Sequence, residues 1–391
     1  MEKEIIAIVF GKSRYSSLNY FSEELAYEFQ TRGYEIVYVD TNNVDSFRNS
    51  LLYMYGKKIK GIFGFNGVCI DLESKDGYRL SELLDTTYYG LYVDHPLYHA
   101  GRHHLIRHRN VAFFVDKRHV EYAKKIYSAY DNIQFLPLGG TPHCNVSKIS
   151  ERRKSVAIFG SYSNPDMLHQ KIETEENETN KTIIYTVINT MINDGVDINV
   201  ALDLLLKNLN INVNNEDYEN ITNLLAKADG YVRNYNRYKV LKSLLDSGID
   251  VDIYGAGWEQ FACSDESRKH LHIYETVDYF KSLELMEEYK IVINIMPCFM
   301  DGSHDRVFNS LLAGTVCVTD KSKYLLDEFD ENENIVFYDI NDTAKLPKII
   351  NELLANEELM QKIADNGKRF CENNHLWKNR VDSILEVMSE M

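Results

Sequence analysis

The most informative group of polar side chains in the sequence lies between two apolar, strand-like runs. The loop that joins these runs contains Asp301, His304 and Arg306 and leads directly into a helical stretch. The first turn of a helix offers free backbone N–H groups and the positive end of the helix dipole, and both attract anions. Imidazole and guanidinium groups can donate further hydrogen bonds to phosphate oxygens. This loop is therefore predicted to bind a diphosphate, and Asn309 could reach a ribose hydroxyl from the next helical turn.

Other candidates directly follow apolar runs, because ligands of open α/β sheets bind beyond the carboxyl ends of the strands. This rule selects polar residues and turn glycines at Gly11, Lys12, Asp94, His95, Gly160, Ser161, Gly255, Gly257 and Trp258. A lone Gly-x-Gly is a weak signal, so Gly255 and Gly257 could equally be simple turn glycines. Trp258 could equally be a core aromatic.

Half of the twelve histidines fall in one short stretch, at positions His95, His99, His103, His104, His108 and His119. Three interpretations remain open. Asp94 or His95 could act as a base in a substrate cleft that Arg102 helps to line. The four-residue spacing of His95, His99 and His103 could serve a metal ion. A solvated basic helix face would need no ligand at all.

These candidates require a scaffold of parallel strands. Short runs rich in Ile, Val, Phe and Tyr occupy residues 5–10, 34–40, 59–65, 88–94, 110–116 and 133–138. Amphipathic stretches separate many of them, and residues 16–33 show apolar side chains three or four apart before a terminating Gly33. Apolar strands that alternate with helices predict a parallel sheet covered on both faces.

The same alternation restarts at residue 154. Strand-like runs follow at residues 154–163, 251–257, 271–274, 290–296, 314–320 and 334–339. We therefore expect two doubly wound, Rossmann-like α/β domains, over 1–150 and 151–370, and a C-terminal helix over 371–391. A helical insert over 165–247 would interrupt the second domain. The carboxyl ends of the two sheets are expected to face each other across a cleft.

Several segments resemble glycosyltransferases of the GT-B fold, particularly the CgeB-type group with a C-terminal domain of the glycosyl transferases group 1 type. Many members carry a Glu, seven further residues, a second Glu and then Ala-x-Ala-x-Gly. In this sequence Asp301 and Asn309 stand at the two Glu positions, and SLLAG follows. Further segments similar to family motifs lie at 90–102, 228–248, 248–261 and 271–295.

The resemblance implies a metal-independent and cofactor-free transfer of a sugar from a nucleotide-diphosphate sugar, most consistent with a UDP sugar. The acceptor would be a protein or surface glycan of a bacterium. Donor binding would involve Gly160, Ser161, Gly255, Gly257, Trp258, Ile273, Tyr274, Asp301, Gly302, Ser303, His304, Arg306, Val307 and Asn309. Asp94 and His95 would be catalytic, and Gly11, Lys12 and Arg102 would lie on the acceptor side. A catalytically silent nucleotide-sugar-binding protein and a nucleotide-sugar epimerase are the alternatives.

The overall composition restricts the function classes. The 391 residues include 43 Lys and Arg against 59 Asp and Glu, and the net charge of −16 argues against nucleic acid as a partner. The six cysteines form no Cys-x-x-Cys pair, which favours reduced cysteines in a cytoplasmic protein. The first apolar run is interpreted as a strand rather than a signal peptide, and no run is long enough to span a membrane.

Overall fold

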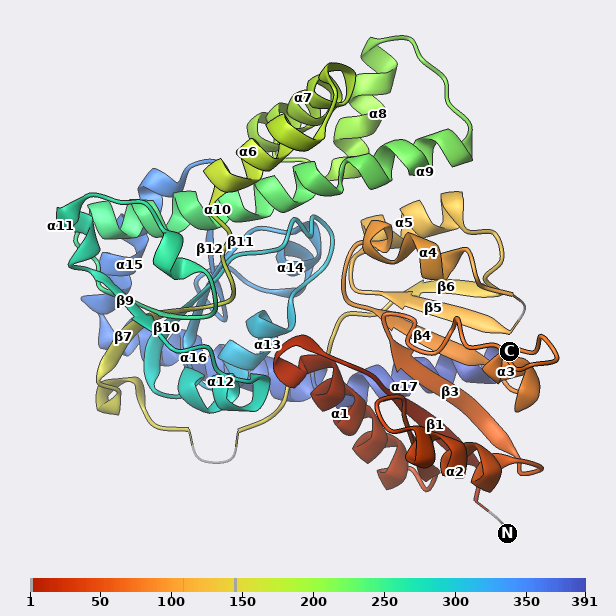
Figure 1. Ribbon diagram of the computed structural model, residues 1–391. Helices are drawn as coiled ribbons and strands as arrows, with labels where there is room; N and C mark the ends of the chain where they lie inside the picture. The colour runs from red at the N-terminus through yellow and green to blue at the C-terminus, as the bar shows by residue number, and fades with distance from the viewer. Residues whose placement is uncertain (1–2, 108, 144–145) are drawn as a thin grey trace. The chain divides into compact units, whose positions relative to one another are not determined.

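The computed structural model describes residues 3–107, 109–143 and 146–391 (Figure 1). The chain divides into two compact units at Gly139, somewhat before the predicted domain boundary at residue 150. The first unit also includes Asp278–Phe280 and Trp377–Met391, and the second comprises Gly140–Val277 and Lys281–Leu376. The C-terminal helix therefore belongs to the first unit, a feature that the sequence pattern does not signal.

The described part of the first unit contains a six-stranded parallel sheet in the order β2-β1-β3-β4-β5-β6. Its strands are β1 (Ile5–Phe10), β2 (Glu35–Asp40), β3 (Ile59–Phe65), β4 (Tyr88–Tyr92), β5 (Asn110–Phe114) and β6 (Asn132–Phe135). Its helices are α1 (Ser17–Thr31), α2 (Val44–Met54), α3 (Leu80–Leu83), α4 (Ala100–His103), α5 (Lys117–Ile126) and α17 (Trp377–Glu390).

The apolar spacing within α1 determines which face this helix buries. Phe21, Leu25 and Phe29 recur every four residues and are almost completely buried. The helix ends before Gly33, whose φ of 91° suits a residue without a side chain. The ring of Phe21 lies 5.4 Å from that of Trp377, so the first turn of α17 packs on the same core.

The described part of the second unit contains a six-stranded parallel sheet in the order β12-β11-β10-β7-β8-β9. Its strands are β7 (Lys154–Phe159), β8 (Val251–Tyr254), β9 (Leu271–Tyr274), β10 (Tyr289–Asn294), β11 (Val316–Asp320) and β12 (Val336–Tyr338). The strand order reverses direction between the neighbours β7 and β10. Ligands of open α/β sheets bind beyond the carboxyl ends of the strands at such a switch point.

Helices cover this sheet and also form the predicted insert between β7 and β8. The insert contains α6 (Pro165–Glu175), α7 (Glu178–Asp194), α8 (Ile198–Asn208), α9 (Asn215–Leu224) and α10 (Ala226–Asp246). The other helices are α11 (Asp265–Arg268), α12 (Tyr279–Met286), α13 (Asp305–Leu312), α14 (Lys323–Glu328), α15 (Leu346–Leu354) and α16 (Glu357–Asn374). The long helix α10, green in Figure 1, supports α6 and α7 along its length.

The structure confirms the predicted α/β class with two parallel sheets and a helical insert. The placement of the two sheets across a cleft stays a prediction. Within the described ranges, no helix combines the length and the apolar sequence that a membrane crossing would require.

Candidate functional site

The turns that follow β7 and β8 are held together by their backbones. The Gly160 N–H donates to the Tyr254 carbonyl over 2.9 Å, and the Tyr162 N–H donates to the Ala256 carbonyl over 2.9 Å. A Cβ atom on Gly255 would lie only 2.1 Å from the carbonyl oxygen of Gly160. Gly255 also has a φ of 152°, which L side chains rarely adopt. Glycine is therefore required where these two turns meet, with Ser161 in the first of them.

Trp258 supports the same turn from the interior. Its side chain is fully buried and stacks on Tyr162 at 4.7 Å between ring centroids. The indole N–H donates to the Gly160 carbonyl over 2.6 Å. These contacts give Trp258 the core role that the sequence also allowed, and its contact with a donor stays a prediction.

Arg306 reaches the turn after β7 from the first turn of α13. Its guanidinium donates to the Phe159 carbonyl at the end of β7. A Cβ atom on Gly160 would lie 2.8 Å from this guanidinium, so glycine provides the space that Arg306 occupies. Because α13 follows β10, this contact places Arg306 at the switch point between β7 and β10, where the sequence predicted an anion site.

The backbone of the first turn of α13 corrects one expectation. His304 caps the helix, and its Nδ1 accepts a hydrogen bond from the Arg306 N–H over 3.3 Å. The Arg306 amide is therefore occupied by the protein and is not free for a diphosphate. Such a cap is favourable because unsatisfied N–H groups at a helix N-terminus are costly. Burial and the neighbouring Arg306 lower the pKa of His304. The same Nδ1 also lies 2.6 Å from Oδ1 of Asp305, so the ring is held between the Asp305 carboxylate and the Arg306 N–H.

The rest of the predicted loop is buried, including Gly302, Ser303 and Val307. Asn309 is fully buried, and its Oδ1 accepts from the Thr141 N–H over 3.0 Å. Asp301 lies 3.6 Å from the Lys323 ammonium. These side chains fix the backbone of the loop in this structure, and their contacts with a donor stay predictions.

Helix α10 adds residues that the sequence pattern did not assign to the site. Arg237 is half-buried, and burial, followed by repulsion from Arg306 and Arg233, lowers the pKa of Arg237 to about 9. Among the described residues, its side chain forms only a 3.4 Å hydrogen bond to Asn234 and no ion pair. Arg233, in contrast, pairs with the buried Asp229 at 2.7 Å. The spacing of Arg233 and Arg237, four residues apart within 228–248, can be seen in the sequence. The sequence pattern assigns them to the helical insert, however, and does not indicate that they lie near Arg306.

Two further donor candidates end the edge strand β9. Ile273 and Tyr274 are 40% and 42% exposed, so both are accessible. The ring of Tyr274 stacks on Tyr254 with centroids 4.9 Å apart, on the neighbouring strand. This fixed, accessible ring lies at the carboxyl end of the sheet.

The first unit collects the predicted acceptor-side residues at the carboxyl edge of its own sheet. Gly11 and the exposed Lys12 follow β1. Arg102 donates to the Asn66 carbonyl, just beyond β3, over 2.6 Å. Asp94 follows β4 and its side chain is 40% exposed.

His95 differs from Asp94 in that its ring is directed into the protein. It is 3% exposed, its Nδ1 accepts from the Leu97 N–H over 3.1 Å, and its ring contacts His119 at 4.7 Å. Asp94 is therefore the more accessible of the two predicted catalytic groups, and the catalytic role of each stays a prediction.

The other histidines of this stretch do not form a uniformly solvated basic face. His103 is buried, its Nδ1 lies 2.7 Å from the Tyr130 hydroxyl, and burial lowers its pKa to about 3. Within the described residues, no group of three or more His, Cys, Asp or Glu side chains is arranged to hold a metal ion. His108 lies outside the described residues.

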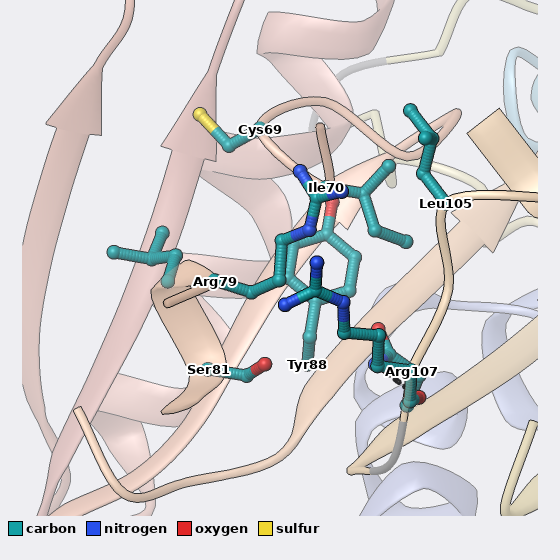
Figure 2. A pocket seen from close by; sticks show the side chains of 9 residues that line it. Cys69, Ile70, Arg79, Ser81, Tyr88, Leu105 and Arg107 are labelled. Atoms are coloured by element: carbon teal, nitrogen blue, oxygen red, sulfur yellow. Dashed lines mark hydrogen bonds between the residues drawn. The ribbon is translucent and has the colours of Figure 1, made fainter. Parts of the chain in front are cut away.

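Figure 2 shows the side chains that line a small hollow in the first unit. The guanidinium groups of Arg79 and Arg107 lie in it and share Glu73, at 3.3 and 3.5 Å. Its wall includes Tyr88 and Asn110, the first residues of β4 and β5. The hollow is thus at the amino ends of the strands, opposite the edge where sheets of this class bind ligands.

The fold is that of the GT-B glycosyltransferases, as comparison with solved structures shows. An α-glucosyltransferase in complex with UDP and a 13-mer DNA containing an HMU base has a TM-score of 0.58 at 10% identity, over 99% of this chain and 100% of the other. HepE from Anabaena in complex with UDP and glucose has a TM-score of 0.56 at 7% identity, over 99% and 100%. Sucrose-phosphate synthase from Thermosynechococcus elongatus has a TM-score of 0.54 at 8% identity, over 99% of both chains.

The family comparison agrees with the fold. Residues 237–386 match the glycosyl transferase-like family, a segment that begins at Arg237 and includes α13. No curated protein sequence matches the chain. The predicted resemblance to GT-B glycosyltransferases is confirmed, and the CgeB-type subgroup stays a prediction.

Proposed function

We propose that this protein is a glycosyltransferase that transfers a sugar from a UDP-linked donor to a protein or glycan acceptor. The observation that carries the proposal is the proximity of Arg237 and Arg306 at the switch point of the second sheet. Arg237 is a half-buried cation without an ion pair in the described structure. A buried charge of this kind is costly unless an opposite charge compensates it, and a diphosphate would supply that charge.

The same two guanidinium groups would serve the chemical step. When the bond between the anomeric carbon and the diphosphate oxygen breaks, negative charge develops on the departing diphosphate. The guanidinium groups of Arg237 and Arg306 are donors that would stabilise this charge without a metal ion. An inverting reaction also needs a base to take the proton of the acceptor hydroxyl, and Asp94 is our candidate.

The comparisons support the donor class, because two of the solved relatives are described in complex with UDP. The assignments of a protein or surface-glycan acceptor, of a bacterial and cytoplasmic setting and of independence from metal and cofactor follow the family resemblance. One of the solved relatives binds DNA. A test of acceptors should therefore include duplex DNA, although the net charge of −16 argues against it.

Thermal shift in the presence of EDTA tests the donor site. UDP and UDP sugars are expected to raise the melting temperature of the wild type and to lose this effect in Arg237→Ala. The matched control is Arg369→Ala, which removes an arginine on the surface of α16 whose hydrogen bond within the described residues goes to Asn366. No shift with any nucleoside diphosphate or nucleotide sugar would overturn the proposal.

Product analysis separates the alternatives on the same scaffold. A glycosyltransferase forms a glycoside only with an acceptor and hydrolyses its donor slowly without one. An epimerase would convert the donor sugar in the absence of any acceptor. A silent binding protein would bind the donor and leave it unchanged.

A further inference from the structure

The turn between β11 and α14 is attached to the loop that leads to α13. Asp320, the last residue of β11, accepts a hydrogen bond from the Met296 N–H over 2.8 Å. The Ser322 hydroxyl donates to the Gly302 carbonyl over 2.7 Å. The Lys323 N–H donates to the Met300 carbonyl over 2.8 Å. Three contacts from one short turn thus span the loop from its beginning almost to His304.

The turn itself is rigidly supported. Asp320 is 5% exposed and Ser322 is 2% exposed. The start of the loop is also fixed, because the Asn294 side chain donates to the Thr319 hydroxyl over 2.9 Å. The Tyr338 hydroxyl donates to the Asn294 carbonyl over 3.1 Å. The position of His304 and Arg306 therefore depends on the turn after β11.

Asp320 also interacts electrostatically with Arg306, one of the cations of the candidate donor site. Arg306 on α13 lowers the pKa of Asp320, and Asp320 in turn raises the pKa of Lys239 on α10. The other titratable groups around it are the Tyr338 hydroxyl on β12 and the Cys298 and Cys317 thiols. Burial raises the pKa of Asp320 to about 7, so a neutral and an ionised form are both accessible near neutral pH.

We propose that the turn Asp320–Lys323 is the positioning element of the donor site, and that Asp320 takes up a proton from solvent when a diphosphate binds beside Arg306. The proposal rests on the proposed function. The ionised carboxylate partly neutralises the cations that attract the donor. A bound diphosphate, in turn, disfavours a second negative charge nearby, so donor binding and protonation of Asp320 strengthen each other.

The positioning part is tested with two serine variants. Ser322→Ala removes the contact with Gly302 and also the cap of α14, whereas Ser264→Ala removes the cap of α11 and a contact with the Ser267 hydroxyl. Hydrogen exchange of the amides in 296–303 should be faster in Ser322→Ala and unchanged in Ser264→Ala. The affinity for UDP-glucose should fall about fivefold in Ser322→Ala alone, as expected for one lost hydrogen bond. Equal exchange in both variants would overturn the positioning role.

The proton-coupled part is tested by titrating UDP-glucose at pH 6 and pH 8, a range in which its diphosphate does not titrate. Wild-type affinity should be up to about tenfold higher at pH 6. Asp320→Asn keeps an acceptor for Met296 and should lose this dependence, whereas the surface control Asp342→Asn should retain it. The same pH dependence in Asp320→Asn would overturn the coupling.

The proposed function and the role of the turn after β11 can fail separately. If the wild type binds UDP-glucose but Asp320→Asn and Ser322→Ala behave as their controls do, the inference fails and the proposed function stands. If the wild type binds no nucleotide, the proposed function and the coupling both fail, and hydrogen exchange still decides whether the turn holds the loop.

Discussion

The arginines near the first sheet differ from those near the second sheet in the partners that they have within the described structure. Near the first sheet, Arg107 lies close to Glu73 and Glu82, and Arg109 pairs with Asp85. Arg102 donates to a backbone carbonyl. At the second sheet, Arg237 lies beside two further arginines and has no ion pair within the described residues.

This difference shows why a local excess of basic residues is a poor guide to an anion site. The stretch GRHHLIRHRN looks strongly basic in the sequence, yet one of its histidines, His103, is buried and its arginines have partners in the protein. The arginines of α10 are fewer and stand in an acidic insert, yet Arg237 has no ion pair within the described residues. The cation that lacks an ion pair within the protein is the better candidate for ligand binding.

The largest expected effect is that of Arg306→Ala. Loss of a fixed donor to the departing diphosphate should lower kcat/KM for the UDP sugar by about 100-fold or more, with circular dichroism unchanged. Steady-state kinetics measure this loss, with Arg369→Ala as the surface control. Unchanged kinetics would remove Arg306 from the site.

Asp94→Asn addresses the first sheet. If Asp94 is the base, kcat should fall about 100-fold while the affinity for UDP stays the same, because the donor is bound elsewhere. Asp85→Asn serves as the control, since Asp85 pairs with Arg109 on the surface. Normal turnover in Asp94→Asn would remove Asp94 as the base and leave either His95 in that role or a retaining reaction, which needs no such base.

Two arginines of the second unit offer a matched stability test. Arg152 is buried and donates to the carbonyls of Tyr289, Ala313 and Ser147, so Arg152→Met should cost about 3 kcal/mol of the free energy of unfolding. Arg237→Met should leave stability equal or higher, because it removes an uncompensated cation. Denaturant unfolding compares the two, and a large loss in Arg237→Met would indicate a structural rather than a binding role.

The smallest effect concerns His103. Its pKa of about 3 in the folded protein is below the 6.5 of an exposed histidine, so the unfolded chain binds the additional proton between these values. Stability should therefore fall by about 1 kcal/mol per pH unit as pH decreases below 6. His103→Phe should reduce this slope in thermal unfolding measured from pH 6 to pH 4. An identical slope would place the dependence on other groups.

The sequence predicted those parts of the fold that depend on local pattern. All the apolar runs assigned as strands form strands, because continuous Ile, Val and Phe segments can be buried only within a covered sheet. The i, i+3 and i+4 spacing of the insert likewise specified helices. The loop before α13 could be recognised as a candidate site because its polar residues lie between two apolar segments that form the buried strands β10 and β11.

The remaining features depend on long-range contacts that no local pattern encodes. The proximity of Arg237 to Arg306 follows from how α10 packs over the sheet, and their separation in sequence conceals it. The orientation of the His95 ring depends on α5, because this ring packs against the ring of His119 on that helix. The return of Trp377 to the first unit depends on an aromatic core that forms only in the folded chain.

That return has a consequence for biogenesis. Phe21 and Phe65 contact Trp377, and Arg380 donates to the Leu138 carbonyl over 3.1 Å. Ribosomal synthesis delivers these closing residues after the whole second unit has emerged. The first unit, whose main part is translated first, is thus completed last. An N-terminal fragment ending at Gly139 would leave Phe21 and Phe65 without the Trp377 ring that covers them.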